Sequence, residues 1–172
     1  MGLKSDIRSS KEFKLFTKIR LESESRLNLE RDRIEALSMH SGRLSRAMYG
    51  KKQYSAKSLL DACMNEMSCR SRLVEIRVQA SIQIDTVHDA SKAIKHHILT
   101  EYADQMKVYK TVGQRQAFID NLIAKAVQLE GEGKALLSLL DSLISDIDKA
   151  SYHLSNMVDV LKLMSDKPGK TL

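Results

Sequence analysis

The sequence predicts an all-α protein, an elongated antiparallel three-helix bundle or coiled coil with long helices. The chain of 172 residues has one proline, Pro168, and seven glycines, so very few positions oblige a helix to end. β-branched residues never form a sustained alternating run, which leaves little from which to build a sheet. Apolar residues in the last third of the chain recur at heptad spacing, as they do in helices that pack on other helices.

The heptad repeat in the last third predicts a helix over residues 112–165. Steps of three and four residues from Ile119 to Met164 meet only one position without an apolar side chain, Gly133. A 3.5-residue period implies a left-handed supercoil with neighbouring helices. For Gly131 and Gly133 we weigh a local kink against a close helix crossing, and we favour the kink. The expected helix-association seam comprises Ile119, Leu122, Leu129, Leu136, Leu140, Leu143, Ile147, Leu154, Met157 and Leu161.

A weaker repeat predicts a first helix over residues 10–49. Its expected inward positions are Phe13, Phe16, Arg20, Ser23, Leu27, Glu30, Ile34, Leu37, Ser41, Leu44 and Met48. Four of these positions are polar, so we expect the helix to lie partly at the rim of a bundle or to be completed by another chain. Ser9 and Glu12 have the spacing of a capping box, and Gly50 is expected to end the helix. Residues 1–8 are expected to be flexible.

A second helix is expected over residues 55–109. Its expected inward stripe is Leu60, Cys63, Met67, Leu73, Ile76, Ala80, Ile84, Val87, Ser91, Ile94, Ile98, Tyr102 and Tyr109. Thr111 and Gln114 have the spacing of another capping box, which predicts a reversal of the chain near Lys110. The alternative is one unbroken helix of more than a hundred residues. We therefore expect a single helical domain over 9–165 and a frayed tail over 166–172.

The net charge of +6 is unevenly distributed along the chain. Residues 36–60 hold five basic side chains and no acidic one, with tyrosines among them. Single-stranded nucleic acid favours such a surface, because cations neutralise phosphates and tyrosine rings stack on bases. An anionic membrane surface and ordinary solvation of a helix end remain alternatives. The candidate nucleic-acid or anion contacts are Arg43, Arg46, Tyr49, Lys51, Lys52, Tyr54 and Lys57.

The first half of the chain also resembles a known family. A charged helix that begins with Leu15-Phe16-Thr17-Lys18 leads to Met48-Tyr49-Gly50-Lys51 and then to a second helix. This layout resembles the opening of phage single-strand recombination mediators of the UvsY type. The resemblance implies a helical, oligomeric protein that helps to load a recombinase onto single-stranded DNA, with Tyr49, Lys51 and Lys52 facing the DNA.

No constellation of residues in the sequence predicts catalysis, a metal or a cofactor. His96 and His97 point about 100° apart on a helix, and no Glu-x-x-His pair is present, so the di-iron bundle pattern is missing. Cys63 and Cys69 lie on different sides of a helix, which argues against a disulfide between them and favours a reduced, cytoplasmic setting. No apolar run is long enough for a transmembrane helix.

Together these observations predict a non-enzymatic assembly or adaptor protein that acts through coiled-coil self-association or through docking of a partner helix. A nucleic-acid-binding accessory protein that uses the basic segment is the alternative. The expected partners are further copies of the chain or another helical protein, with single-stranded nucleic acid as the alternative partner. The oligomeric number, the partner's identity and the biological process do not follow from the sequence.

Overall fold

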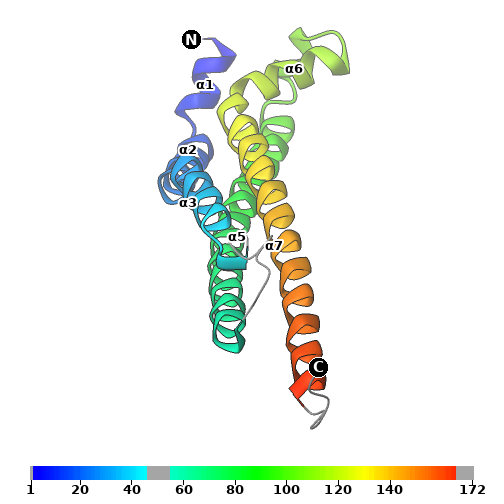
Figure 1. Ribbon diagram of the computed structural model, residues 1–172. Coiled ribbons are helices and arrows are strands. Elements are labelled where there is room, and N and C mark those ends of the chain that lie inside the picture. The colour runs from blue at the N-terminus through cyan, green and yellow to red at the C-terminus, as the bar shows by residue number, and fades with distance from the viewer. Residues whose placement is uncertain (1, 46–54, 166–172) are drawn as a thin grey trace. The chain divides into compact units, whose positions relative to one another are not determined.

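The computed structural model describes residues 2–45 and 55–165, with side chains described up to residue 163, and it confirms the all-α class (Figure 1). No strand occurs within these ranges. The helices are α1 (Leu3–Ser9), α2 (Lys11–Arg26), α3 (Leu29–Ser41), α5 (Ala56–Glu101), the 3-10 helix η1 (Gln105–Val108), α6 (Val112–Leu122) and α7 (Ala124–Ser165).

The N-terminal part differs from the single helix predicted over 10–49. Ser10 is extended, with φ −62° and ψ 151°, and its side chain accepts a hydrogen bond of 3.2 Å from the backbone N–H of Phe13. Ser10 is therefore the N-cap of α2, and the predicted cap at Ser9 is wrong. The expectation that residues 1–8 are flexible is also wrong for α1, since Leu3–Ser9 is helical and Ile7 is fully buried. The expected end at Gly50 lies outside the described residues.

A second interruption at Leu27 changes which side chains of the first segment lie inward. Leu27 leaves the helical region, with φ −89° and ψ 85°, and its side chain is buried. Before this point the predicted inward positions are largely buried, among them Phe13 and Phe16. After it the prediction is wrong. The predicted positions Ile34, Leu37 and Leu44 are exposed, whereas the residues buried in this part of the chain are Asp32, Ala36, Arg43 and Ser45.

The chain turns between α5 and α6, and the predicted capping box is confirmed. The Thr111 side chain accepts a hydrogen bond from the Gln114 N–H, while the Gln114 side chain accepts one from the Thr111 N–H. Because α5 ends at Glu101, the alternative of one unbroken helix is wrong. The third predicted helix is divided in two, since Ile123 separates α6 from α7.

The chain divides into two compact units. Unit 1 comprises Met1–Leu29 and Gln79–Leu137, and unit 2 comprises Glu30–Val78 and Ser138–Leu172. The long helices α5 and α7 each contribute one part to each unit.

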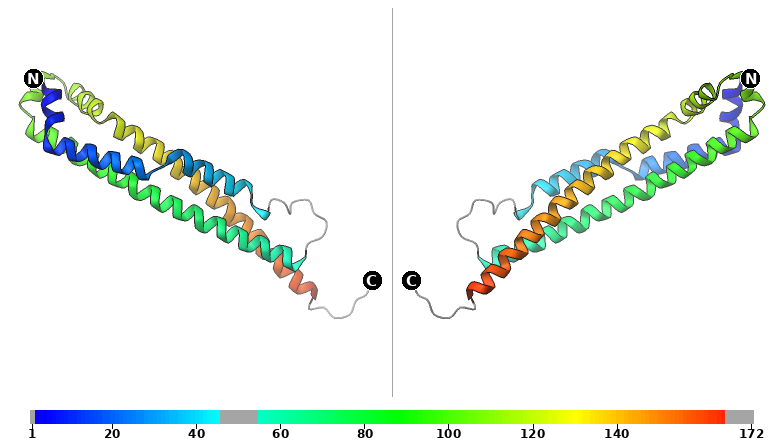
Figure 2. Two further views of the ribbon diagram at one scale, coloured as in Figure 1. Left: turned by 90° about the vertical axis from the view of Figure 1, so that its left-hand side faces the viewer. Right: turned by 90° about the vertical axis from the view of Figure 1, so that its right-hand side faces the viewer.

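Within unit 1, contacts between side chains show that α5 runs antiparallel to α6 and α7. His88 pairs with Glu130 at 3.0 Å, and further along α5 Lys95 pairs with Asp120 at 3.1 Å, so the partner's number falls as that of α5 rises. The α2 helix runs beside the same part of α5, as both views of Figure 2 show. Glu12 of α2 lies 3.5 Å from His97 of α5.

Within unit 2, α5 runs antiparallel to both α7 and α3. Arg70 pairs with Asp148 and Arg77 with Asp141, so α5 and α7 are antiparallel there as well. Pairs between α3 and α5 also run in opposite directions along the two helices. Glu35 pairs with Arg72 at 2.7 Å, and Met39 lies opposite Cys69. In each unit, side-chain contacts therefore join α5 to α7 and to a segment from the first part of the chain, α2 in unit 1 and α3 in unit 2.

The heptad positions of the last third are covered by other parts of the chain. Eight of the ten residues of the predicted seam are 8% exposed or less, namely Ile119, Leu122, Leu129, Leu136, Leu140, Leu143, Ile147 and Leu154. Met157 and Leu161 are partly buried against Leu59, Ala62 and Leu154. The apolar repeat continues across the break at Ile123, which is itself 1% exposed.

The exception in the repeat, Gly133, is a close crossing between helices of unit 1. A Cβ added at Gly133 would lie 2.6 Å from Cγ1 of Ile84, far inside van der Waals contact. Gly131 is two residues away in the same helix and has nothing within 4 Å of such a Cβ. The crossing is thus the reason for one glycine only, and it accounts for Gly133 without the kink that we favoured.

Replacing each glycine by alanine should therefore change stability in opposite directions. Gly131→Ala should raise the free energy of unfolding by about 1 kcal/mol, because alanine is the better helix former. Gly133→Ala should lower it by about 1–3 kcal/mol, because the added methyl overpacks the contact with Ile84. Urea unfolding followed by circular dichroism measures both, and equal effects of the two substitutions would contradict the close crossing.

Candidate functional site

The structure describes only part of the basic segment that the sequence singled out. Lys57 is exposed in the first turn of α5. Arg43 is only 4% exposed, and its guanidinium is engaged with carboxylates of the same chain. Its predicted contact with an outside anion is therefore replaced by a role inside the protein. The other candidates, Arg46, Tyr49, Lys51, Lys52 and Tyr54, lie outside the described residues.

Arg43 is the centre of a buried polar cluster in unit 2. Its Nη1 donates to Oε2 of Glu66 at 3.0 Å, and Nη2 donates to Oδ2 of Asp146 at 2.7 Å. Its Nε donates to the backbone carbonyl of His40 at 3.1 Å. The Ser45 hydroxyl donates to the second oxygen of Glu66, and Nε2 of His40 lies 2.7 Å from Oδ2 of Asp146. These bonds join α3, α5 and α7.

The arrangement compensates a charge that has no contact with water. Glu66 is 0% exposed, and both of its carboxylate oxygens have a partner. Burial of such an ion is tolerated when its charge is paired and its lone pairs are satisfied. Asp146 lies at the open side of the cluster, with its side chain 52% exposed. The hydrogen bond with His40, followed by that from Arg43, lowers the pKa of the Asp146 carboxyl. Its contribution to stability is thus present above the usual carboxyl pKa and is lost as the pH falls through the lowered one.

Burial of this ion pair leaves an apolar stripe of α5 on the outer surface of unit 2. The sequence predicted Leu60 and Met67 inward, but the structure buries Leu59, Ala62 and Glu66. Leu60 is 59% exposed and Met67 is 68% exposed, so the prediction is wrong for both. We use the name α5 stripe for the following residues, which are spaced by alternating steps of four and three: Leu60, Met64, Met67, Ser71, Val74 and Val78.

Most of the α5 stripe is accessible to another molecule. Met64 is 63% exposed and Val78 is 47% exposed, while Val74 is half-buried. Exposed apolar residues that occur singly need no explanation, but a row at heptad spacing is the pattern of a helix that packs on another helix.

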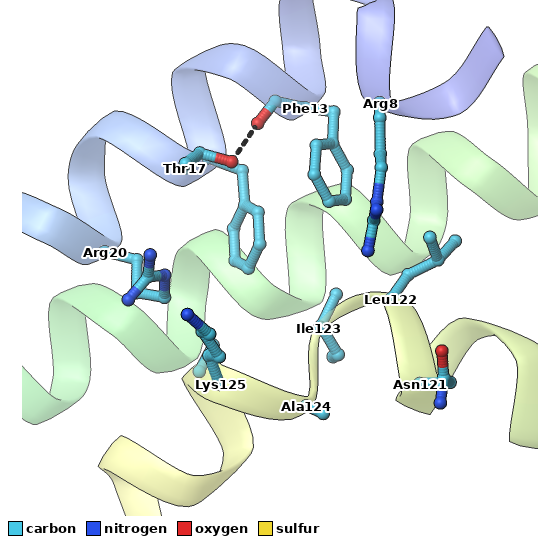
Figure 3. Close-up of a pocket in the computed structure, with 11 residues that line it drawn as sticks. Arg8, Phe13, Thr17, Arg20, Asn121, Leu122, Ile123, Ala124 and Lys125 are labelled. Atoms are coloured by element: carbon cyan, nitrogen blue, oxygen red, sulfur yellow. Dashed lines mark hydrogen bonds between the residues drawn. The ribbon is translucent and has the colours of Figure 1, made fainter. Parts of the chain in front are cut away.

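A second feature with binding potential is a pocket of about 370 Å³ in unit 1 (Figure 3). Phe13 of α2 projects toward the chain segment that links α6 to α7, and Phe16 of the same helix also lines the pocket. Basic side chains from three helices line the same pocket, namely Arg8, Arg20 and Lys125. The pocket is open to solvent on one side, so its contents exchange with the surroundings.

The described residues show no arrangement typical of metal binding or thiol chemistry. No group of three or more His, Cys, Asp or Glu side chains in these residues is placed to hold a metal ion. Cys63 and Cys69 are free thiols. Burial, with a further contribution from the Glu66 carboxylate, raises the pKa of the Cys69 thiol, which disfavours the reactive thiolate. None of the helices within the described ranges is both long and apolar enough to cross a lipid bilayer.

Comparisons of the chain with models of protein families, with curated proteins and with solved structures found no match.

Breaking the buried ion pair should cost far more than breaking an exposed one. Arg43→Met leaves the Glu66 carboxylate buried without its counter-ion and should lower the free energy of unfolding by about 3–5 kcal/mol. The double change Arg43→Met with Glu66→Met should recover most of that loss, because no charge stays buried. Arg70→Met breaks an ion pair whose two side chains are about half exposed, and it should hardly shift the urea midpoint. Equal losses for Arg43→Met and Arg70→Met would contradict the role of burial.

Proposed function

We propose that this chain is a non-enzymatic assembly protein that associates with a second copy of itself through the α5 stripe. The observation that carries the proposal is the exposure of Leu60, Met64 and Met67 at heptad spacing on a helix of 46 residues. An exposed Met or Leu side chain gains about 1.5–3 kcal/mol when it is fully buried. A second helix that covers this row supplies that burial.

Charge complementarity favours a parallel pair of α5 helices. In a parallel coiled coil, the residue before one core position faces the residue after the next core position of the partner helix. With the stripe as core, this rule brings Arg70 of one copy to Glu75 of the other, and the contact occurs twice by symmetry. Both side chains are exposed, and each also has a partner within its own chain, Asp148 for Arg70 and Arg72 for Glu75. An antiparallel pair would instead bring Arg70 of one chain near Arg70 of the other, and repulsion between these like charges disfavours that orientation.

The parallel pairing also places a small polar residue in the core of the pair. Ser71 interrupts the apolar row and would face Ser71 of the second copy. Small or polar residues at single core positions lower the stability of a coiled coil while fixing its register. The proposed pair is therefore specific and of modest affinity.

The nucleic-acid hypothesis stays a prediction from the sequence. The structure engages Arg43 in the buried cluster, so that hypothesis now depends on Lys57 and on residues outside the described ranges.

Substitution in the stripe should abolish association without unfolding the chain. Met64→Glu with Met67→Glu should weaken self-association about hundredfold or more, because two buried side chains are lost and like charges face each other. Tyr152→Glu, at a residue that is 66% exposed on α7, is the matched control and should leave association unchanged. Sedimentation equilibrium over a range of concentrations measures this, with circular dichroism as the check on folding. A wild-type chain that stays monomeric at all concentrations would contradict the proposal.

Disulfide trapping distinguishes the two orientations of the pair. In a Cys63→Ser background, Met64→Cys should form a dimer under mild oxidation if the pair is parallel, because the introduced thiol then faces the same thiol of the second copy. If the pair is antiparallel, this variant should form no disulfide-linked dimer. A mixture with a Cys63→Ser, Val74→Cys chain should then form a disulfide between the two different chains.

A further inference from the structure

The pocket of unit 1 combines an apolar lining with basic side chains at its rim. Its apolar lining is supplied by two aromatic rings of α2 and by side chains at the junction of α6 and α7. These residues are Phe13, Phe16, Leu122, Ile123, Ala124 and Ala126. The volume of about 370 Å³ lies within the range of small-molecule sites, which are typically apolar with a few polar groups that orient the ligand.

Two polar side chains beside this lining, Thr17 and Asn121, already form hydrogen bonds within the chain. The Thr17 hydroxyl lines the pocket but already donates to the backbone carbonyl of Phe13 at 2.9 Å, as the dashed line in Figure 3 shows. The Asn121 side chain accepts a hydrogen bond from Lys4 at 3.1 Å. Both of these polar groups therefore already have a hydrogen-bond partner within the chain.

Two of the three cations at the rim of the pocket have no ion pair within the described ranges, although Glu24 and Glu132 line a neighbouring pocket together with Lys125. Arg20 pairs with Glu24, the neighbour four residues along α2. The side chains of Arg8 and Lys125 line the same pocket, and within the described ranges neither side chain has a hydrogen bond or an ion pair. In Figure 3, Arg8 descends from α1 toward Leu122, and Lys125 rises from the start of α7 toward α2. An anion in the pocket would be attracted by both of these cations.

We propose that this pocket binds an amphiphilic anion, an alkyl chain with a single carboxylate, as in a medium-chain fatty acid. The alkyl chain lies against Phe13 and Phe16, and the carboxylate lies between Arg8 and Lys125. Arginine binds carboxylates with paired hydrogen bonds, and lysine adds a point charge, so the pair discriminates an acid from the corresponding alcohol.

Isothermal titration calorimetry of the full chain at low ionic strength tests this, with decanoate as the probe. Decanol keeps the alkyl chain without the charge, and acetate keeps the charge without the chain. Decanoate should bind at least tenfold more tightly than either. Equal affinity for decanoate and decanol, or no decanoate binding at millimolar concentration, would overturn the proposal.

Charge-neutralising variants locate the site. Arg8→Gln with Lys125→Gln should weaken decanoate binding tenfold or more. Lys14→Gln with Lys134→Gln removes the same charge from exposed positions of α2 and α7 outside the pocket, and it should change the affinity less than twofold. Equal losses in the two double variants would show a general effect of net charge and would overturn the assignment.

Flotation with phosphatidylglycerol vesicles separates a free acid from a membrane surface. If the cations serve this pocket, decanoate should bind in the absence of any vesicle and should not require one. Vesicle binding that depends on Arg8 and Lys125, together with no binding of free decanoate, would assign these cations to a membrane surface and would overturn the pocket as a fatty-acid site.

Discussion

The buried ion pair between Arg43, two residues after the end of α3, and Glu66 of α5 fixes how the end of α3 meets α5 in unit 2. If either side chain left the interior, the other would remain as a buried charge without a counter-ion, so the end of α3 is held at one place along α5. Ser45, His40 and Asp146 complete the hydrogen bonds of the pair. A purely apolar interior would tolerate several registers more readily, because hydrophobic contacts carry little directional information.

The exposed apolar surface follows from that register. With Arg43 inward, the neighbouring Leu44 lies outside, and with Glu66 inward, Met67 lies outside. A fold that served stability alone would gain from the opposite arrangement, since burial of leucine and methionine contributes more than burial of charge. The free energy lost by leaving Leu44 and Met67 exposed is recovered if these side chains are buried against a partner. The proposed pairing through the α5 stripe supplies one, and the pocket of unit 1 is a separate binding feature that does not depend on it.

Features encoded by local sequence could be predicted, and features that depend on distant residues could not. The heptad from Ile119 to Leu154 and the cap at Thr111 depend on fixed short spacings, and the structure places them as expected. Ser9 and Ser10 are adjacent serines with equal capping chemistry, so the choice between them depends on the burial of Ile7 in α1. The break at Leu27 has no proline or glycine to mark it.

The candidate sites could not be predicted from the sequence, because each depends on residues that lie far apart along the chain or on which face of a helix is buried. Glu66 is 23 residues from Arg43, and nothing in the local pattern around either residue marks it for burial. The pocket is formed by residues 8–20 and 121–126, which only the fold brings together. The α5 stripe could be seen as an apolar row, but its direction could not, because Leu59 and Leu60 are equally suited to a core.

The register of α3 is tested most directly by the chemical reactivity of single cysteines placed on its two faces. In a Cys63→Ser, Cys69→Ala background, Leu37→Cys should react with a maleimide at a rate close to that of the unfolded chain, and Ala36→Cys should react many times more slowly. These rates follow from a Leu37 that is 42% exposed and an Ala36 that is fully buried. A protected cysteine at 37 together with a reactive one at 36 would show the apolar register predicted by the sequence, and the buried ion pair would then not be what sets the register of unit 2.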